Sequence, residues 1–199
     1  MQPAAGPAGA GGWSDEPIDL KPLKSVNADF TFSVGQLLFQ RMTIQRSTLT
    51  LVLKNGVLTA TLKELNLYDG HASGQLVADG SKATPSIRTK LDVTGVQALA
   101  FLTDAVGLER LEGVGALSVD LKSSGPSQRA LMNGLNGNGS VKFVDGAIRG
   151  INLAAIARSV LKALSGDALG ESAKTDFAEL SGTFTVTNGV LDNLDLKLL

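Results

Sequence analysis

The sequence predicts a mainly β (β-rich α+β) fold, in which stacked antiparallel hairpins twist into a groove-like sheet with two or three short packing or capping helices. Apolar and polar residues alternate along most of the chain, which is the period of a strand with one buried face. Eight glycines directly follow Asn or Asp, and these dipeptides suit hairpin turns or helix ends. Two-residue turns leave no room for the crossover that parallel pairing requires. We therefore expect antiparallel strands throughout.

The clearest predicted hairpin joins residues 48–54 to residues 57–63 through Asn55-Gly56. Its threonines alternate with aliphatic residues, so the two kinds of side chain occupy opposite faces. The aliphatic face consists of Leu49, Leu51, Leu53, Leu58, Ala60 and Leu62. The same alternation predicts further strands at residues 71–79, 87–93, 115–121, 140–144, 182–187 and 190–198.

Three segments have helical rather than alternating patterns. Residues 96–106 form one, with Thr94 and Gln97 spaced as a capping box and Gly107 placed to end it. A shorter helix is expected over 126–132, because proline suits the first helical turn. Residues 151–164 form the third, and its apolar stripe is Leu153, Ile156, Ala157, Val160, Leu161 and Leu164.

Length and charge set the domain organisation and exclude several partners. Residues 1–26 are predicted to be a flexible linker and lead-in, and residues 27–199 to be the folded domain. The chain has 18 Lys and Arg against 19 Asp and Glu, so it lacks the basic field that nucleic-acid binding requires. No run approaches the ~18 to 20 apolar residues of a membrane span.

The inventory of reactive residues points away from catalysis. There is no Cys and one histidine, His71, which excludes thiol nucleophiles and disfavours metal sites. The carboxylate pairs Glu109 with Glu112 and Asp192 with Asp195 lie beside basic residues, as on a solvated polar face. The glycine-rich run 133–139 lacks the strand-loop-helix order of a phosphate loop. We therefore expect no enzyme activity, no metal and no cofactor.

The aliphatic strand face is the most distinctive feature of the sequence. Aromatic residues make up only 5% of the chain, so this face lacks the stacking groups that sugar or base sites recruit. An aliphatic trough suits acyl chains, and its candidate lining residues are Leu49, Leu51, Leu53, Leu58 and Leu62. The alternative is that these leucines pack against the helices or another leaf of the sheet and form a closed core.

Several segments resemble a known family. Residues 139–161 contain a strand, Asp145-Gly146, Arg149-Gly150 and an amphipathic helix in that order. Together with residues 175–196 and the upstream stretches 13–30, 65–76 and 102–125, they resemble the carboxy-terminal region of AsmA-like proteins of Gram-negative bacteria. The resemblance covers residues 13–199.

The resemblance implies a periplasmic protein that an amino-terminal helix outside this chain anchors to the inner membrane. It also implies a groove that carries phospholipids between the inner and outer membranes. Its implied partners are phospholipid acyl chains, the inner membrane and outer-membrane assembly proteins, with no nucleic acid. Asp145 and Gly146 match the family's turn. Arg149 beside Gly150 is expected to hold the following helix through backbone carbonyls, or else to bind a lipid phosphate.

Three functions compete at this point. The leading hypothesis is a non-catalytic lipid-handling module. The first alternative is an interaction scaffold that modulates outer-membrane protein assembly by pairing its edge strands with a client, which requires unprotected edges. The second is a carbohydrate-active β-solenoid enzyme, which needs charged residues clustered with aromatics. One Trp and one Tyr in the whole chain disfavour that enzyme.

Overall fold

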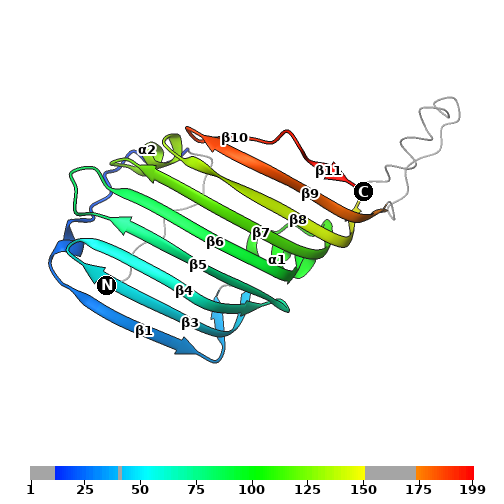
Figure 1. The fold of residues 1–199 in the computed structure, drawn as a ribbon, viewed down its shortest axis with the longest axis horizontal. Coiled ribbons are helices and arrows are strands. Elements are labelled where there is room, and N and C mark those ends of the chain that lie inside the picture. Colours follow the sequence, from blue (N-terminus) through cyan, green and yellow to red (C-terminus); the bar gives the residue numbers. More distant parts are fainter. Residues whose placement is uncertain (1–11, 40–41, 151–173) are drawn as a thin grey trace, which may run out of the picture.

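A computed structural model describes residues 12–39, 42–150 and 174–199 and confirms the predicted fold class. The strands of these residues form one open antiparallel sheet, in the order β1-β3-β4-β5-β6-β7-β8-β9-β10, with β2 paired to β3 and β11 to β9 (Figure 1). The strands are β1 (Ala28–Val34), β2 (Leu37–Phe39), β3 (Met42–Lys54), β4 (Val57–Leu67), β5 (Gly70–Asp79), β6 (Ser86–Gln97), β7 (Leu111–Ser124), β8 (Asn136–Arg149), β9 (Lys174–Thr187), β10 (Val190–Asp192) and β11 (Lys197–Leu198).

Two Asn-Gly dipeptides form the predicted hairpin turns. Asn55 and Gly56 have φ values of 52° and 81°, and Asn188 and Gly189 have 50° and 78°. Positive φ at both central residues is the type I′ geometry, whose twist matches that of the flanking strands. The turn between β4 and β5 lies one residue earlier than predicted, because Tyr68 and Asp69 take the positive φ values and Gly70 already belongs to β5.

Other Asn/Asp-Gly dipeptides lie inside a strand rather than in turns. Residues 136–139 open β8, which continues without interruption to Arg149. The predicted Asp145-Gly146 turn is wrong: these residues form a β-bulge within β8. Glu112 pairs with Ala147 and Val114 with Val144, so two residues of β8 oppose one of β7. Asp145 adopts the left-handed φ of 49° that such an irregularity requires.

Two of the predicted helices lie within the described residues, and both are present. Helix α1 (Ala98–Val106) ends at Gly107 as predicted, and Gly107 has a φ of 72°. The predicted capping box is wrong, because Thr94 belongs to β6 and Gln97 makes no side-chain cap. Helix α2 (Gln128–Asn133) begins after Ser127, whose hydroxyl accepts from the amide of Ala130. The predicted helix over 151–164 lies outside the described residues.

The part of the lead-in that the structure describes runs along one end of the sheet. Pro17 bridges to Ser127, the amide of Ile18 donates to the carbonyl of Pro126 at 2.7 Å, and the 3-10 helix η1 (Lys21–Lys24) contacts β3 and β4. At the other end, α1 packs on a buried cluster formed by Leu67, Ala72, Val93 and Val96, with Phe101 against it. The region between the two ends contains the candidate site.

Candidate functional site

The β3–β4 hairpin brings all five predicted trough leucines together. Opposite residues in an antiparallel pair lie on the same face of the sheet. Leu49 pairs with Leu62 and Leu53 with Leu58, while Leu51 lies between them opposite Ala60. Each of these side chains is half-buried. The two-residue turn at Asn55-Gly56 fixes this register, because a slip of one residue would turn the leucines to the other face.

The leucine cluster continues onto both neighbouring strands. In β1, Phe30 pairs with Leu51 and Phe32 with Leu49, and their rings stack with centroids 6.0 Å apart. In β5, Leu76 lies opposite Ala60. Phe30 is 55%, Phe32 50% and Leu76 42% exposed. The two phenylalanines were not predicted to join the cluster, although the alternation Phe30-Thr31-Phe32 carries the same period-two signal.

We name the apolar surface formed by β1, β3, β4 and β5 the open apolar face. In the described part of the chain, neither a helix nor a second sheet packs over the middle of these strands (Figure 1). Its leucines touch cross-strand neighbours at their sides and remain accessible from above. Leu67, at the α1 end of β4, shows the contrast, since it is only 5% exposed. Within the described residues, the open apolar face is therefore an uncovered surface.

The same face is built differently over β7, β8 and β9. A side-chain carbon added at Gly139 would overlap the ring of Phe184. Gly115 and Phe143 make the same kind of contact at 3.0 Å. Each glycine thus leaves room for a ring from the next strand to lie against the backbone. The rings take the place of a covering layer in this half.

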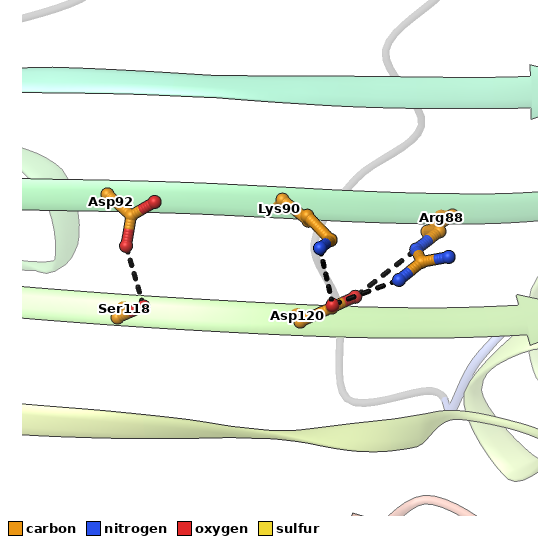
Figure 2. A network of polar contacts seen from close by, with 5 residues as sticks. All are labelled: Arg88, Lys90, Asp92, Ser118 and Asp120. Carbon is orange, nitrogen blue, oxygen red and sulfur yellow. Dashed lines mark hydrogen bonds and ion pairs between the residues drawn. The ribbon is translucent and has the colours of Figure 1, made fainter.

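The opposite face of the sheet is polar and cross-linked. Figure 2 shows Asp120 of β7 between two cations of β6, with Arg88 Nη2 at 3.0 Å and Lys90 Nζ at 3.1 Å. Beside them, Ser118 donates to Asp92 at 2.6 Å. The hydrogen bond from Arg88, followed by that from Lys90, holds the pKa of Asp120 below its ordinary value.

Glu179 of β9 also forms ion pairs on this polar face. Lys142 Nζ lies 2.8 Å from one carboxylate oxygen, and the hydroxyl of Ser181 donates to the other at 2.7 Å. Lys197 adds a third contact at 3.7 Å. The bonds from Lys142 and Ser181 lower the pKa of Glu179 to about 2.

The structure assigns Arg149 a partner that the sequence did not predict. Its guanidinium pairs with Glu112 on β7, and Lys174 on β9 contacts the other oxygen of that carboxylate at 3.1 Å. Hydrogen bonds from Lys174 and then Arg149 lower the pKa of Glu112. The helix that Arg149 was expected to hold lies outside the described residues. The backbone amide of Arg149 donates to the carbonyl of Arg110 at 2.8 Å.

The remaining candidate residues form hydrogen bonds on the polar surface. Nδ1 of His71 lies 2.5 Å from the side-chain oxygen Oδ1 of Asn66. The carboxylate of Asp195 accepts hydrogen bonds from the backbone amide and the hydroxyl of Thr183, each at 2.7 Å. A hollow of about 430 Å³ near α2 is lined by groups of both charges, including Arg88, Lys122 and Asp79. Within the ranges that the structure describes, no three potential metal ligands gather, and no helix is long and apolar enough to cross a membrane.

Comparison with known proteins identifies one family. A family model with the description AsmA family matches residues 6–196, which is nearly the whole chain. No curated protein and no solved structure matched the sequence. The matched range includes β1 through β10 and therefore the whole open apolar face.

Proposed function

The chain belongs to the AsmA family, and we propose that its open apolar face binds phospholipid acyl chains during lipid transport between the inner and outer membranes. On this proposal the protein acts in the periplasm, is held to the inner membrane and catalyses no reaction. Family membership is consistent with a role in outer-membrane biogenesis or lipid transport. The observation that carries the proposal is the partial exposure of five aligned leucines, above which no element of the described residues packs.

The chemistry of the open apolar face fits an acyl chain. Its side chains are leucine, alanine and phenylalanine, which form no hydrogen bonds. The face therefore suits a ligand that needs none. Transfer of acyl carbons from water onto such a surface is favourable by about 0.8 kcal/mol for each buried CH₂. Strands lie about 4.8 Å apart, so β1, β3, β4 and β5 span about 14 Å between their axes. That width accommodates a section of an extended acyl chain.

The polar face supports the same interpretation. Threonines cover the opposite side of β1, β3 and β4, and ion pairs lie on that side of the neighbouring strands β6 and β7, so only one side of the sheet favours apolar ligands. Monomeric soluble proteins rarely leave large contiguous apolar patches uncovered, and those that do usually bind something there. On this proposal, an acyl chain lies on the apolar side of the single-layer sheet, and the sheet shields that side of the acyl chain from water.

One observation favours the scaffold alternative as a second candidate. The outer edge of β1 pairs with no strand among the described residues. An unpaired edge can accept a strand from a client protein, as the alternative requires. Lipid binding and strand pairing would use different parts of the molecule, so an experiment can separate them.

Native mass spectrometry of the chain purified from a Gram-negative cell envelope tests the proposal. We expect phospholipid masses on the folded protein, and we expect Leu51→Ser and Leu62→Ser to reduce their occupancy severalfold. Thr50→Ser and Thr61→Ser are the matched controls, because these threonines pair with each other on the opposite face. Protein without bound lipid, or equal losses in leucine and threonine variants, would contradict the proposal.

A further inference from the structure

The two edges of the sheet are protected to different degrees. Along β9, residues 185–187 pair with β10 and residues 180–181 with β11. Between these two paired stretches, Asp195 accepts a hydrogen bond from the backbone amide of Thr183 at 2.7 Å, and the side chain of Asn193 donates one to the carbonyl of Thr183 at 2.5 Å. The amide of Ala178 donates to Leu199 at 2.7 Å. Short strands and polar side chains thus close this edge, which is how many proteins prevent unwanted pairing.

The edge formed by β1 has none of these protections. Its seven residues, Ala28–Val34, are paired with β3 on the inner side only, within the part of the chain that the structure describes. The strand has no Lys, Arg or Pro, and its one charge is Asp29. Phe30 and Phe32 are half exposed at this edge. Backbone donors and acceptors beside exposed rings are a ready site for another strand.

The sequence of β1 is nearly palindromic about its central residue. In ADFTFSV, Thr31 has a phenylalanine on each side, then a polar residue, then a small apolar residue. Antiparallel pairing of two such strands about Thr31 would place Phe30 opposite Phe32 of the second copy, and Asp29 opposite Ser33. Aromatic pairs across strands stabilise a sheet, and no like charges would face each other. The strand is therefore complementary to itself.

We propose that β1 pairs with β1 of a second copy of this chain, in antiparallel register centred on Thr31. Such a contact is isologous, since the same surface serves both subunits. Because opposite residues share a face, the open apolar faces of the two copies would join on the same side of one longer sheet. The closed β9 edge prevents further addition, so the assembly stops at two copies.

The strength expected of this contact is modest. One pair of seven-residue strands buries less than the ~1,200 Å² typical of stable specific interfaces. We therefore expect a dimer in the micromolar range, which demands a test sensitive to register as well as to mass. The chain has no native Cys, so single cysteines can report the register without background.

Single-cysteine variants of the full 199-residue chain test the register. In the proposed pairing, Thr31→Cys faces itself with Cα atoms about 4.5 to 5.5 Å apart, a distance that a disulfide spans. Ser33→Cys is the matched control, because it lies on the same strand and face but about 13 Å from its copy. Mild oxidation should give mostly cross-linked dimer at position 31 and little at 33. Equal cross-linking at both positions, or none at 31, would overturn the register.

Sedimentation equilibrium of the unmodified chain tests the dimer itself. The symmetric contact contains two Phe30–Phe32 pairs, and Phe32→Lys removes both of them. This variant should raise the dissociation constant of the dimer at least about tenfold. Leu191→Lys at the opposite edge should leave the constant unchanged, because β10 takes no part. A chain that remains monomeric at high micromolar concentration, or an edge that binds a different polypeptide instead, would overturn the proposal. Lipid occupancy is measured separately and does not decide it.

Discussion

The two faces of the sheet follow the same strands but are stabilised in different ways. On the polar face, side chains from neighbouring strands bind one another, as Asp120 does with Arg88 and Lys90. On the apolar face, Leu49, Leu51 and their neighbours contact cross-strand partners, and no element of the described residues packs over them. Polar side chains of the sheet thus pair with one another, whereas the apolar side chains on the other face remain partly exposed. The difference indicates that stability resides in the strand ladder and the sheet ends, while no described element covers the open apolar face.

The largest effect is expected where the apolar face is filled by rings. A valine at Gly139 would clash with the ring of Phe184 and with the carbonyl of Ser118, 2.5 Å from the added carbon. We expect Gly139→Val to lower the free energy of unfolding by about 3 kcal/mol, measured by urea denaturation. Gly35→Ala is the control, because nothing lies within 4 Å of the added carbon there. Similar midpoints for the two variants would show that the ring contacts do not hold this half together.

The next effect compares closed and open parts of the apolar face. Leu67 is 5% exposed, so Leu67→Ala should cost about 2 kcal/mol in free energy of unfolding. Leu51→Ala should cost about 1 kcal/mol, because its side chain is half-buried already. Thermal or urea unfolding of the two variants measures the difference. An equal or greater loss at Leu51 would mean that the leucines form a closed core.

A smaller effect concerns pH and the polar face. The pKa of Glu179 is about 2 in the folded protein, below its ordinary value of 4.5. As the pH falls, Glu179 therefore becomes protonated in the unfolded chain before it does in the folded protein. The contribution of the ionised Glu179 to folding stability is fully present above pH 4.5 and is lost as the pH falls toward 2. The melting temperature of the native chain should fall across this range, and that of Glu179→Gln should fall less. Parallel curves for both proteins would contradict this role of Lys142 and Ser181.

The smallest effect is expected at Asp120. Its ion pairs are exposed, and salt screens such pairs. Asp120→Asn should lower the melting temperature slightly at low ionic strength and not at all at high salt. Binding of an apolar dye to the opposite face should be unchanged. A loss of dye binding would show that the two faces are coupled rather than independent.

Local patterns were sufficient to predict the fold class and the leucine cluster. Alternation assigned Leu49, Leu51 and Leu53 to one face, and the Asn55-Gly56 turn then fixed their partners. The dipeptide Asp145-Gly146 was misinterpreted as a turn because the same chemistry suits a bulge. Only the partner strand, which continues on both sides of the bulge, decides between the two.

Contacts between distant residues could not be predicted. Arg149 and Glu112 are 37 positions apart, and they meet only because β7 and β8 are neighbours in a particular register. Phe30 and Phe32 join the leucines because β1 pairs with β3, and the alternation within β1 does not reveal which strand is its partner. The degree of exposure of the open apolar face also depends on which elements cover it, and alternation along a strand carries no information about that.

Photo-cross-linking in the cell envelope tests the central claim most directly. A photoreactive amino acid is placed at Leu51 on the open apolar face, and in a second variant at Thr50, the adjacent residue on the polar face. We predict phospholipid adducts at position 51, identified by mass spectrometry, and at most traces at position 50. Cross-links from position 51 to other parts of the same chain, or lipid adducts equally at both positions, would contradict an acyl-binding face.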